Sequence, residues 1–363
     1  MRLIKRIAWG LLALLIVIAL VVVDFLRHGG QFRSLEPHFA GTCESVPLSV
    51  SAEDIQIDRS GNIAYLSALD RRGQVEGKDV RGTILRIDLN ARPLAATPAL
   101  VADPPDFRPH GMSLYIAPDG AQRLFVISHP PAQPHVVEIF DRNAEGLFAH
   151  VQTLRSPLLV KPNALAAVSP TQFYVANDSG ARSRMERVGE MLFRRKLATL
   201  VYFDGGRTAN VGPTIASGTG MAMSADGRDV YVSESNKHRV LVFARGLATG
   251  ELRLKEEIDV GSHADNLNVA ADGAIWVTSH PKVMALARQF GDASKVSPTQ
   301  IVRVDPDPAT DERVREIYLD LGEEMSAGSV AATYTDAQGD AMLVGSITAR
   351  KVLACRLPAA GAT

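Results

Sequence analysis

The sequence predicts an all-β protein, a six-bladed β-propeller carried behind one N-terminal transmembrane helix. Three observations lead to this prediction. A turn followed by a short apolar strand recurs six times, a second strand-like run follows each copy, and a separate apolar run lies at the extreme N-terminus. Repeats of this length, each one sheet long, are typical of propeller blades. The 363 residues suffice for one large domain of this kind.

The N-terminal segment predicts a membrane anchor. Arg2, Lys5 and Arg6 precede an apolar run over Ile7–Val23, which is long enough for a short transmembrane helix and also resembles a signal-peptide core. No small-x-small cleavage site follows, since the run ends in Asp24–Arg27. We therefore expect residues 1–30 to form an uncleaved signal anchor, rather than a removed signal peptide or a buried core helix. The basic start would stay cytoplasmic, and the rest would face the periplasm or the cell exterior.

The repeated unit is a turn, usually containing Asp-Gly or Ser-Gly, followed by a short apolar strand. The aromatic or apolar centres of successive copies lie 45 to 67 residues apart, which suits four-stranded blades with loops of variable length. The six strands are Ile63–Ser67, Leu124–Ser128, Phe173–Ala176, Val230–Ser233, Ile275–Thr278 and Met342–Gly345.

A second β-type run follows each copy, and several of these runs alternate apolar and polar residues. Six such units without long helices between them favour a propeller over a sandwich. A seventh blade would have to lack any visible turn signal. The expected organisation is a linker over residues 31–42, the propeller over 43–358 and a tail over 359–363. The second runs are Thr83–Leu89, His135–Asp141, Thr199–Asp204, Arg239–Phe243, Gln300–Val304 and Lys351–Leu357.

The two cysteines lie at opposite ends of the predicted propeller. Cys43 precedes the first unit and Cys355 lies in the last strand of the sixth. In an exported chain they can pair, and the bond would join the first strand to the last blade. Two free buried thiols are the alternative.

One segment has helical rather than strand-like spacing. In Arg182–Leu197, the residues Met185, Val188, Met191 and Leu192 recur at helical intervals with charges between them. We expect a short surface helix near the tunnel mouth. It can simply cover the domain surface, close over the mouth, or lie on a membrane.

Charge argues against nucleic acid as a partner, because 39 basic and 40 acidic side chains leave a net charge of −1.

Polar residues near the starts of the units suggest a metal site. Each precedes an aromatic strand by one short strand, so the blades could point them at one axis. Carboxylate and amide oxygens are the ligands that calcium prefers, although Asp and Asn are also common in turns. These residues are Glu53, Asp54, Asn163, Asp265 and Asn266.

Three histidines near the repeated units are candidates for a catalytic role. His110 lies in a Pro-His-Gly sequence, and His129 and His280 each end a predicted strand. Histidine is the usual general base near neutral pH. A single histidine at a strand end is also often a hydrogen-bonded structural residue.

Taken in order, these motifs resemble the serum paraoxonase/arylesterase family of calcium-dependent lactonases. The order is Glu-Asp, Pro-His-Gly, His-Pro, Pro-Asn, Phe-Tyr-x-x-Asn-Asp, Asp-Gly-x-x-Val-Tyr, Asp-Asn-x-x-Val and Trp-Val-x-x-His-Pro, and it extends from Cys43 to Leu357. The N-terminal apolar segment and the cysteine pair are also similar to that family.

The resemblance implies roles for particular residues. Those that match ligands of a catalytic calcium are Glu53, Asn163, Asp265 and Asn266. Asp54 and the carbonyl of Met112 match ligands of a second, structural calcium. His110 and His129 match a histidine dyad, and His280 matches a further histidine of the substrate pocket.

Two positions depart from the family pattern. Thr219 stands where the family has an asparagine ligand, and Ala164 stands where it has an aspartate shared with the second ion. A threonine hydroxyl is a shorter and poorer calcium ligand. We therefore expect one calcium ion, and the second is in doubt.

The resulting hypothesis is a calcium-dependent hydrolase of lactones or aryl esters, with a metal-polarised carbonyl and a histidine-activated water. Its partners would be a small-molecule lactone or ester and the membrane. One alternative is a non-catalytic, membrane-tethered propeller that acts as a binding or scaffold protein. Another is a propeller of the gluconolactonase and strictosidine-synthase-like group with other substrate chemistry. The sequence leaves the substrate and the oligomeric state open.

Overall fold

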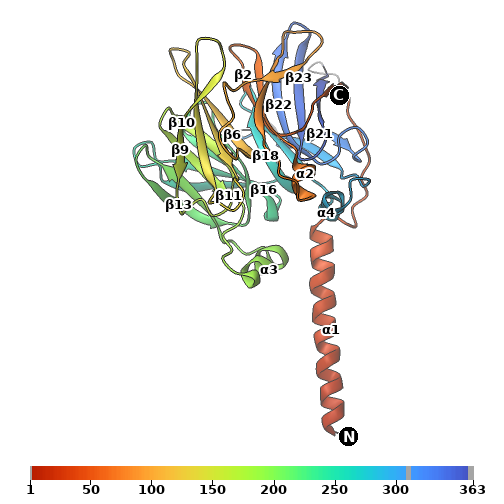
Figure 1. Ribbon diagram of the computed structural model, residues 1–363. Helices are drawn as coiled ribbons and strands as arrows, with labels where there is room; N and C mark the ends of the chain where they lie inside the picture. The colour runs from red at the N-terminus through yellow and green to blue at the C-terminus, as the bar shows by residue number, and fades with distance from the viewer. Residues whose placement is uncertain (1, 308–311, 359–363) are drawn as a thin grey trace.

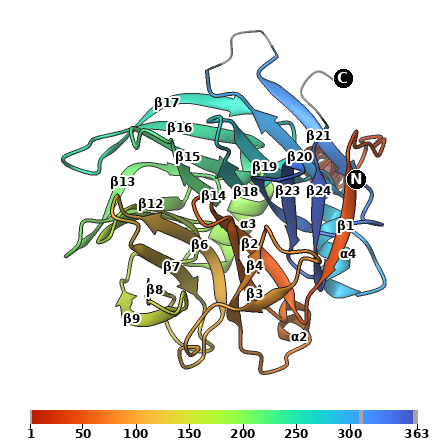
Figure 2. The same cartoon turned by 90° about the horizontal axis from the view of Figure 1, so that it is seen from above.

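Six four-stranded antiparallel sheets stand around a central axis, which confirms the predicted six-bladed propeller (Figure 1). The computed structural model describes residues 2–307 and 312–358. Seen from above, the six first strands form the inner ring and the chain moves outward through each blade (Figure 2).

Each of the first five blades is built from four consecutive strands. Blade 1 contains β2 (Ser51–Asp58), β3 (Ile63–Leu69), β4 (Thr83–Asp88) and β5 (Ala96–Pro98). Blade 2 contains β6 (Pro109–Ile116), β7 (Gln122–Ser128), β8 (Val136–Arg142) and β9 (Phe148–Arg155). Blade 3 contains β10 (Pro162–Ser169), β11 (Gln172–Asn177), β12 (Ala198–Phe203) and β13 (Thr208–Ile215). Blade 4 contains β14 (Gly218–Met223), β15 (Asp229–Glu234), β16 (Arg239–Arg245) and β17 (Leu252–Asp259). Blade 5 contains β18 (His263–Val269), β19 (Ile275–His280), β20 (Thr299–Val304) and β21 (Val314–Asp320).

The sixth blade closes the ring with a strand from the start of the chain. It contains β22 (Gly328–Asp336), β23 (Gly339–Ser346), β24 (Lys351–Arg356) and, antiparallel to β24, β1 (Thr42–Pro47). Cys43 lies opposite Cys355 in this pairing, and the two form a disulfide. The predicted clasp between first strand and last blade is therefore confirmed.

The strands that the repeat revealed are the second and third strands of each blade. The central residues of strands such as β3, β7 and β16 are buried because a neighbouring blade packs on each face, so these strands are nearly continuous apolar runs, whereas β4 alternates buried and partly exposed residues. Adjacent blades share their cores. For example, Tyr174 and Leu200 of blade 3 pack in one cluster with Val232 and Phe243 of blade 4. Each pair of neighbouring blades thus shares an apolar cluster of its own.

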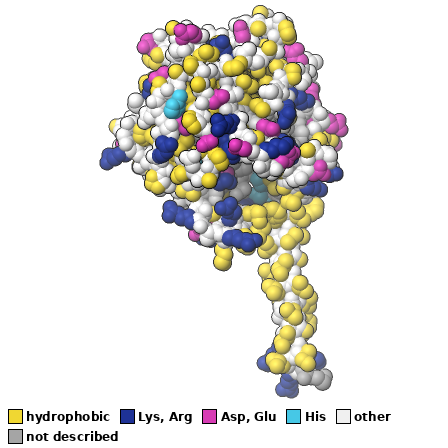
Figure 3. Space-filling model, viewed as in Figure 1, with side chains coloured by type: hydrophobic (Ala, Val, Ile, Leu, Met, Phe, Trp, Pro, Cys, Tyr) yellow, Lys and Arg dark blue, Asp and Glu magenta, His cyan; other side chains and the backbone are white. Residues whose placement is uncertain are grey.

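Helix α1 (Arg2–His28) projects away from the propeller, and its apolar side chains are exposed along its length (Figures 1 and 3). It is long and apolar enough to cross a membrane. The short helices lie in connections on the face from which α1 leaves: α2 (Arg71–Val75), α3 (Arg184–Phe193), η1 (Ser235–Lys237) and α4 (Val283–Gly291).

Helix α3 is the surface helix that the sequence predicted, and a capping box fixes its start. The Glu186 N–H donates to Ser183 Oγ at 3.1 Å, and the Ser183 N–H donates to Glu186 Oε2 at 3.1 Å. The sequence did not indicate α2 or α4. Both lie in long connections, and they touch each other through Arg72, which donates to the Phe290 carbonyl at 2.9 Å.

Candidate active site

Six of the residues that the sequence suggested lie at equivalent bulges in the first strands of blades 1 to 5, whereas Asp54 stays in the ladder opposite Ser67. Near its start, every inner strand shows a shift in register against the second strand. A bulge leaves its residue out of the ladder and re-aims the side chain. The residues skipped by the ladder are Glu53, His110 with Gly111, Asn163, Thr219, Asp265 with Asn266, and Ser329. The bulges therefore bring residues from all six blades to one end of the tunnel.

We call this group of bulge residues the tunnel floor. Within it, the Glu53 carboxylate contacts Asn266, His110 and Arg71. Its side chain is buried, and Asn266 Nδ2 donates to Glu53 Oε1 at 2.9 Å. His110 Nε2 lies 3.4 Å from Glu53 Oε1, and Arg71 Nη2 lies 3.6 Å from Glu53 Oε2. Burial opposes ionisation, but the His110 imidazole, the Arg71 charge and the Asn266 amide outweigh it and lower the pKa of the Glu53 carboxyl. Glu53 is therefore a carboxylate.

The backbone of Glu53 is also held from two other blades. Asn266 Nδ2 donates to the Glu53 carbonyl at 3.1 Å, and Ser329 Oγ donates to the same oxygen at 2.7 Å. Ser329 is fully buried at the bulge of blade 6. Sequence reasoning missed it, although its position after Gly328 repeats the placement of Thr219 after Gly218.

Asp265 and Asn163 complete a set of oxygen donors. His280 Nε2 lies 2.9 Å from Asp265 Oδ2, while burial and the Glu53 charge raise the pKa of the Asp265 carboxyl. Within residues 2–307 and 312–358, Asn163 Oδ1 is buried without a hydrogen-bond partner, and so is Glu53 Oε2. Buried carboxylates beside unsatisfied oxygens have the donor chemistry that fits calcium, because a hard cation would satisfy both the charge and the lone pairs.

The Asp54 carboxylate is held by two backbone N–H groups. Its Oδ2 accepts from the Met112 N–H at 2.7 Å and its Oδ1 accepts from the Ile55 N–H at 2.7 Å. Burial, together with the Glu53 charge, raises the pKa of Asp54 to about 7. The Asp54 carboxylate thus contacts Met112 through the Met112 N–H, and the ligand role of the Met112 carbonyl stays a prediction.

Thr219 reaches the tunnel floor but uses its hydroxyl on the backbone. Thr219 Oγ1 donates to the Ala264 carbonyl at 2.8 Å, next to Asp265. The substitution from the family's asparagine therefore leaves a shorter group that is already hydrogen-bonded.

Three histidines form a hydrogen-bonded chain beside Glu53. His110 Nδ1 lies 3.0 Å from His129 Nε2, and His129 Nδ1 lies 2.8 Å from His135 Nδ1. Burial, with His110 and His135 as neighbours, lowers the pKa of His129 well below its usual value, so its imidazole is neutral. This row of histidines extends from the buried Glu53 to the half-buried His135. The sequence identifies His135 only as the first residue of a predicted strand.

A cavity of about 500 Å³ opens over the His110–His129–His135 chain. Arg71 of α2 and Arg187 of α3 are among its lining residues, so its mouth lies on the face from which α1 leaves (Figure 1). Lys161 and Arg108 also line it, which gives the entrance a basic character. Sequence reasoning missed Arg71 because nothing in its local sequence indicates that it turns inward; it is held there by donating to the Pro109 carbonyl at 2.9 Å.

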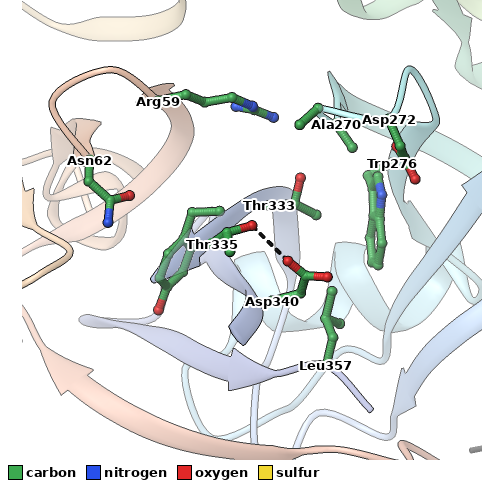
Figure 4. A pocket seen from close by; sticks show the side chains of 11 residues that line it. Arg59, Asn62, Ala270, Asp272, Trp276, Thr333, Thr335, Asp340 and Leu357 are labelled. Carbon is green, nitrogen blue, oxygen red and sulfur yellow. Dashed lines mark hydrogen bonds between the residues drawn. The ribbon is translucent and has the colours of Figure 1, made fainter. Parts of the chain in front are cut away.

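A second cavity, of about 360 Å³, is shown in Figure 4. Arg59 and Ala270, which line it, directly follow the inner strands β2 and β18, so it lies at the opposite end of the inner strands. Arg59, Trp276 and Asp340 are among its lining residues, and Thr335 Oγ1 donates to Asp340 Oδ1 at 2.7 Å. It contains none of the site residues that the sequence suggested.

The chain is similar to known proteins over most of its length. The chain is 28% identical over 335 residues to serum paraoxonase/arylesterase 1 of Rattus norvegicus, covering 90% of this chain and 92% of that protein. It is 28% identical over 343 residues to serum paraoxonase/arylesterase 2 of Gallus gallus, covering 93% and 94%. Among solved structures, a luciferin-regenerating enzyme shares the fold with a TM-score of 0.54 at 11% identity, covering 88% of this chain and 96% of that one. The Arylesterase family model matches residues 48–357, and the chain therefore belongs to the arylesterase family.

Proposed function

We propose that the protein hydrolyses lactones or aryl esters at the tunnel floor, with a bound calcium ion and a histidine-activated water. The observation that carries the proposal is the convergence of Glu53, Asn163, Asp265 and Asn266 beside the His110–His129 pair. Membership of the arylesterase family and the names of its relatives support the same class of reaction. A pure binding module would not need a histidine chain beside the oxygen donors.

These four residues would hold the calcium, which would supply positive charge beside the oxygen of the substrate carbonyl. His110 would take a proton from the attacking water. The proton could pass from His110 Nδ1 to His129 Nε2, 3.0 Å away, and onward from His129 Nδ1 to His135 Nδ1, 2.8 Å away. His280, held on Asp265, would border the substrate pocket. Asn266, through its bonds to Glu53, would keep that carboxylate aimed at the tunnel floor.

The test uses phenyl ester and lactone hydrolysis by the full chain, with His110→Gln and Asp265→Ala variants. We expect His110→Gln to lower kcat by about 10²- to 10⁴-fold, as loss of a general base does. We expect Asp265→Ala to lose calcium and activity together. His150→Gln is the matched control, because His150 bonds to Glu138 on the outer part of blade 2. Full, chelator-insensitive activity in both site variants would refute the assignment.

The number of calcium ions separates the proposal from a binding module. Ala164 has no side-chain oxygen to offer a second ion, so we propose one calcium per chain. Calorimetry on metal-free protein should give a stoichiometry of one. No bound calcium would favour a non-catalytic propeller or metal-free chemistry.

The proposed location follows from α1. The helix would remain as an anchor, with the propeller in the periplasm or outside the cell. Protease added to sealed, right-side-out vesicles should then digest or release the propeller, and protection of the propeller would contradict this orientation.

A further inference from the structure

Three histidines meet where the anchor helix joins the propeller. His28 is the last residue of α1, His238 follows η1 between β15 and β16, and His263 is the first residue of β18. One ring nitrogen from each lies within 4.8 Å of those of the other two. Three separate segments of the chain therefore converge on one point outside the tunnel floor.

The three rings are in direct contact with one another. His238 Nε2 lies 2.9 Å from His263 Nδ1, and the rings of His28 and His238 stack with centroids 3.8 Å apart. His28 Nε2 lies 3.0 Å from the Asn236 carbonyl. A carbonyl in that position fixes Nε2 as the donor and leaves Nδ1 with a free lone pair. This is the outer contact that metal-binding histidines usually make.

The environment favours neutral imidazoles, the form that binds metals. Burial, with His28 and Arg33 nearby, lowers the pKa of His238 to about 3. Burial, with His238 nearby, also lowers the pKa of His263 well below its usual value.

The neighbouring charges are largely paired with other groups. Arg194 bonds to Asp24 at 2.9 Å, and Arg33 Nη1 donates to the Gly261 carbonyl at 2.9 Å. A cavity of about 290 Å³ adjoins the three histidines, with Asp24 and Ser262 on its wall. It gives a fourth ligand, such as water, room to bind and gives an ion a path to the site.

The backbone holds His28 in this place. Gly30 has φ of +72°, and a Cβ there would come within 1.9 Å of the Pro281 carbonyl oxygen. The Val283 N–H also donates to the Gly29 carbonyl at 3.1 Å. The turn after α1 is thus packed against the β19–α4 connection, and His28 is positioned by the fold.

We propose that His28, His238 and His263 form a binding site for a divalent transition metal of the zinc type, linking the anchor helix to blades 4 and 5. Neutral imidazoles suit zinc and its neighbours and are poor ligands for calcium. The site is separate from the proposed calcium site, which uses oxygen donors. Its occupancy would fix how the propeller stands on its anchor.

The test is metal titration of the full chain in detergent, prepared metal-free and without a polyhistidine tag. We expect one equivalent of Zn²⁺ by calorimetry, and Co²⁺ should give the visible absorption of a tetrahedral site. Replacement of His28, His238 or His263 by Ala, one at a time, should weaken Zn²⁺ binding by at least about 100-fold, beyond what loss of an outer contact costs. Excess Ca²⁺ should not displace the Co²⁺ signal.

The matched control is His129→Gln, which alters the other histidine group of the molecule. It should keep the Zn²⁺ stoichiometry and the Co²⁺ spectrum. Circular dichroism and retained Ca²⁺ binding would show that the variants are folded. The proposal is overturned if the wild-type chain binds no Zn²⁺, or if binding survives all three Ala replacements or disappears with His129→Gln. Loss of calcium-dependent hydrolysis would bear on the proposed function and not on this site.

Discussion

Arg71 places a permanent positive charge 3.6 Å from Glu53 Oε2, among the residues proposed to hold calcium. The guanidinium is buried, and burial lowers its pKa although Glu53 and Asp265 act in the opposite direction. Without a metal, this ion pair compensates part of the carboxylate charge. With calcium bound, the two cations would repel each other across the same carboxylate. Arg71 therefore tunes the affinity of the site.

We expect Arg71→Met to tighten calcium binding by about tenfold, because it removes a like charge in a buried site. The calcium-free protein should lose about 3 kcal/mol of stability, since an uncompensated buried carboxylate remains. Calcium calorimetry and thermal unfolding in chelator would measure both effects. Arg72→Met is the matched control, because Arg72 bonds to Phe290 instead. Weaker calcium binding in Arg71→Met would show that Arg71 mainly positions Glu53.

The ion pairs of Asp336 should make the free energy of unfolding depend on pH. Arg356 Nη1 donates to Asp336 Oδ1 at 2.6 Å, and Arg92 also bonds to this carboxylate. The Arg356 bond in particular lowers the pKa of Asp336 to about 2, below the unfolded value near 3.9. The stabilisation is therefore complete above about pH 4 and is lost as the pH falls through 2.

We expect Asp336→Asn to lower the free energy of unfolding by about 1 to 2 kcal/mol at pH 7, and the difference from wild type to shrink toward zero near pH 2. Denaturant unfolding across this pH range would measure it. Asp103→Asn removes the same charge from an exposed position and should have little effect. A pH-independent difference for Asp336→Asn would contradict the ion-pair explanation.

At the scale of elements, α3 combines an exposed apolar face with a position near the anchor. Met185, Met191 and Phe193 are exposed, and α3 lies on the side of the propeller from which α1 leaves (Figure 1). Lys and Arg side chains gather over this region and at the far end of α1 (Figure 3). This combination is typical of a helix that lies in a membrane interface. Among the roles considered for this helix, we therefore favour membrane contact.

A polarity-sensitive dye on Phe193→Cys should report an apolar environment when the full chain is in lipid nanodiscs. The same dye on Asp119→Cys should report water, since Asp119 lies exposed in the β6–β7 turn at the opposite end of the inner strands. Equal, water-like emission at both positions would rule out contact between α3 and the bilayer.

Local signals predicted the repeated strands, and long-range geometry decided the rest. Turns such as Asp226-Gly227 and apolar runs such as Val230–Ser233 predict a strand from the local sequence alone. The Arg71–Glu53 contact and the meeting of His28 with His238 depend on how distant segments pack, which no local pattern contains. The polar residues of the site were found because the repeat places them equivalently. That these residues lie at bulges could be recognised only from the strand register in the structure.

At the scale of the whole molecule, the ring is closed by one strand pairing and one covalent bond. The disulfide spans 312 residues of sequence. Cross-linking so long a loop restricts the unfolded chain strongly, and loss of a native disulfide typically costs about 2 to 5 kcal/mol.

We expect the double variant Cys43→Ser/Cys355→Ser to lower the free energy of unfolding by about 2 to 5 kcal/mol. The sixth blade should open first, with amide exchange accelerated in β1 and β24 more than in β11. Reduction of the wild-type protein should reproduce both changes, and an unchanged unfolding midpoint in either case would contradict a stabilising clasp.

The pairing of β1 with β24 also sets the order in which the molecule can be completed during synthesis. β1 leaves the ribosome first among the strands, yet its partner follows 312 residues later. At translation rates of about 5 to 20 residues per second, β1 waits roughly 15 to 60 s with an unpaired edge. Only residues 29–41 separate this strand from the anchor helix, which limits how far it can move before the last blade arrives. The first five blades can form as they emerge, whereas the ring is finished only when the last strand is released.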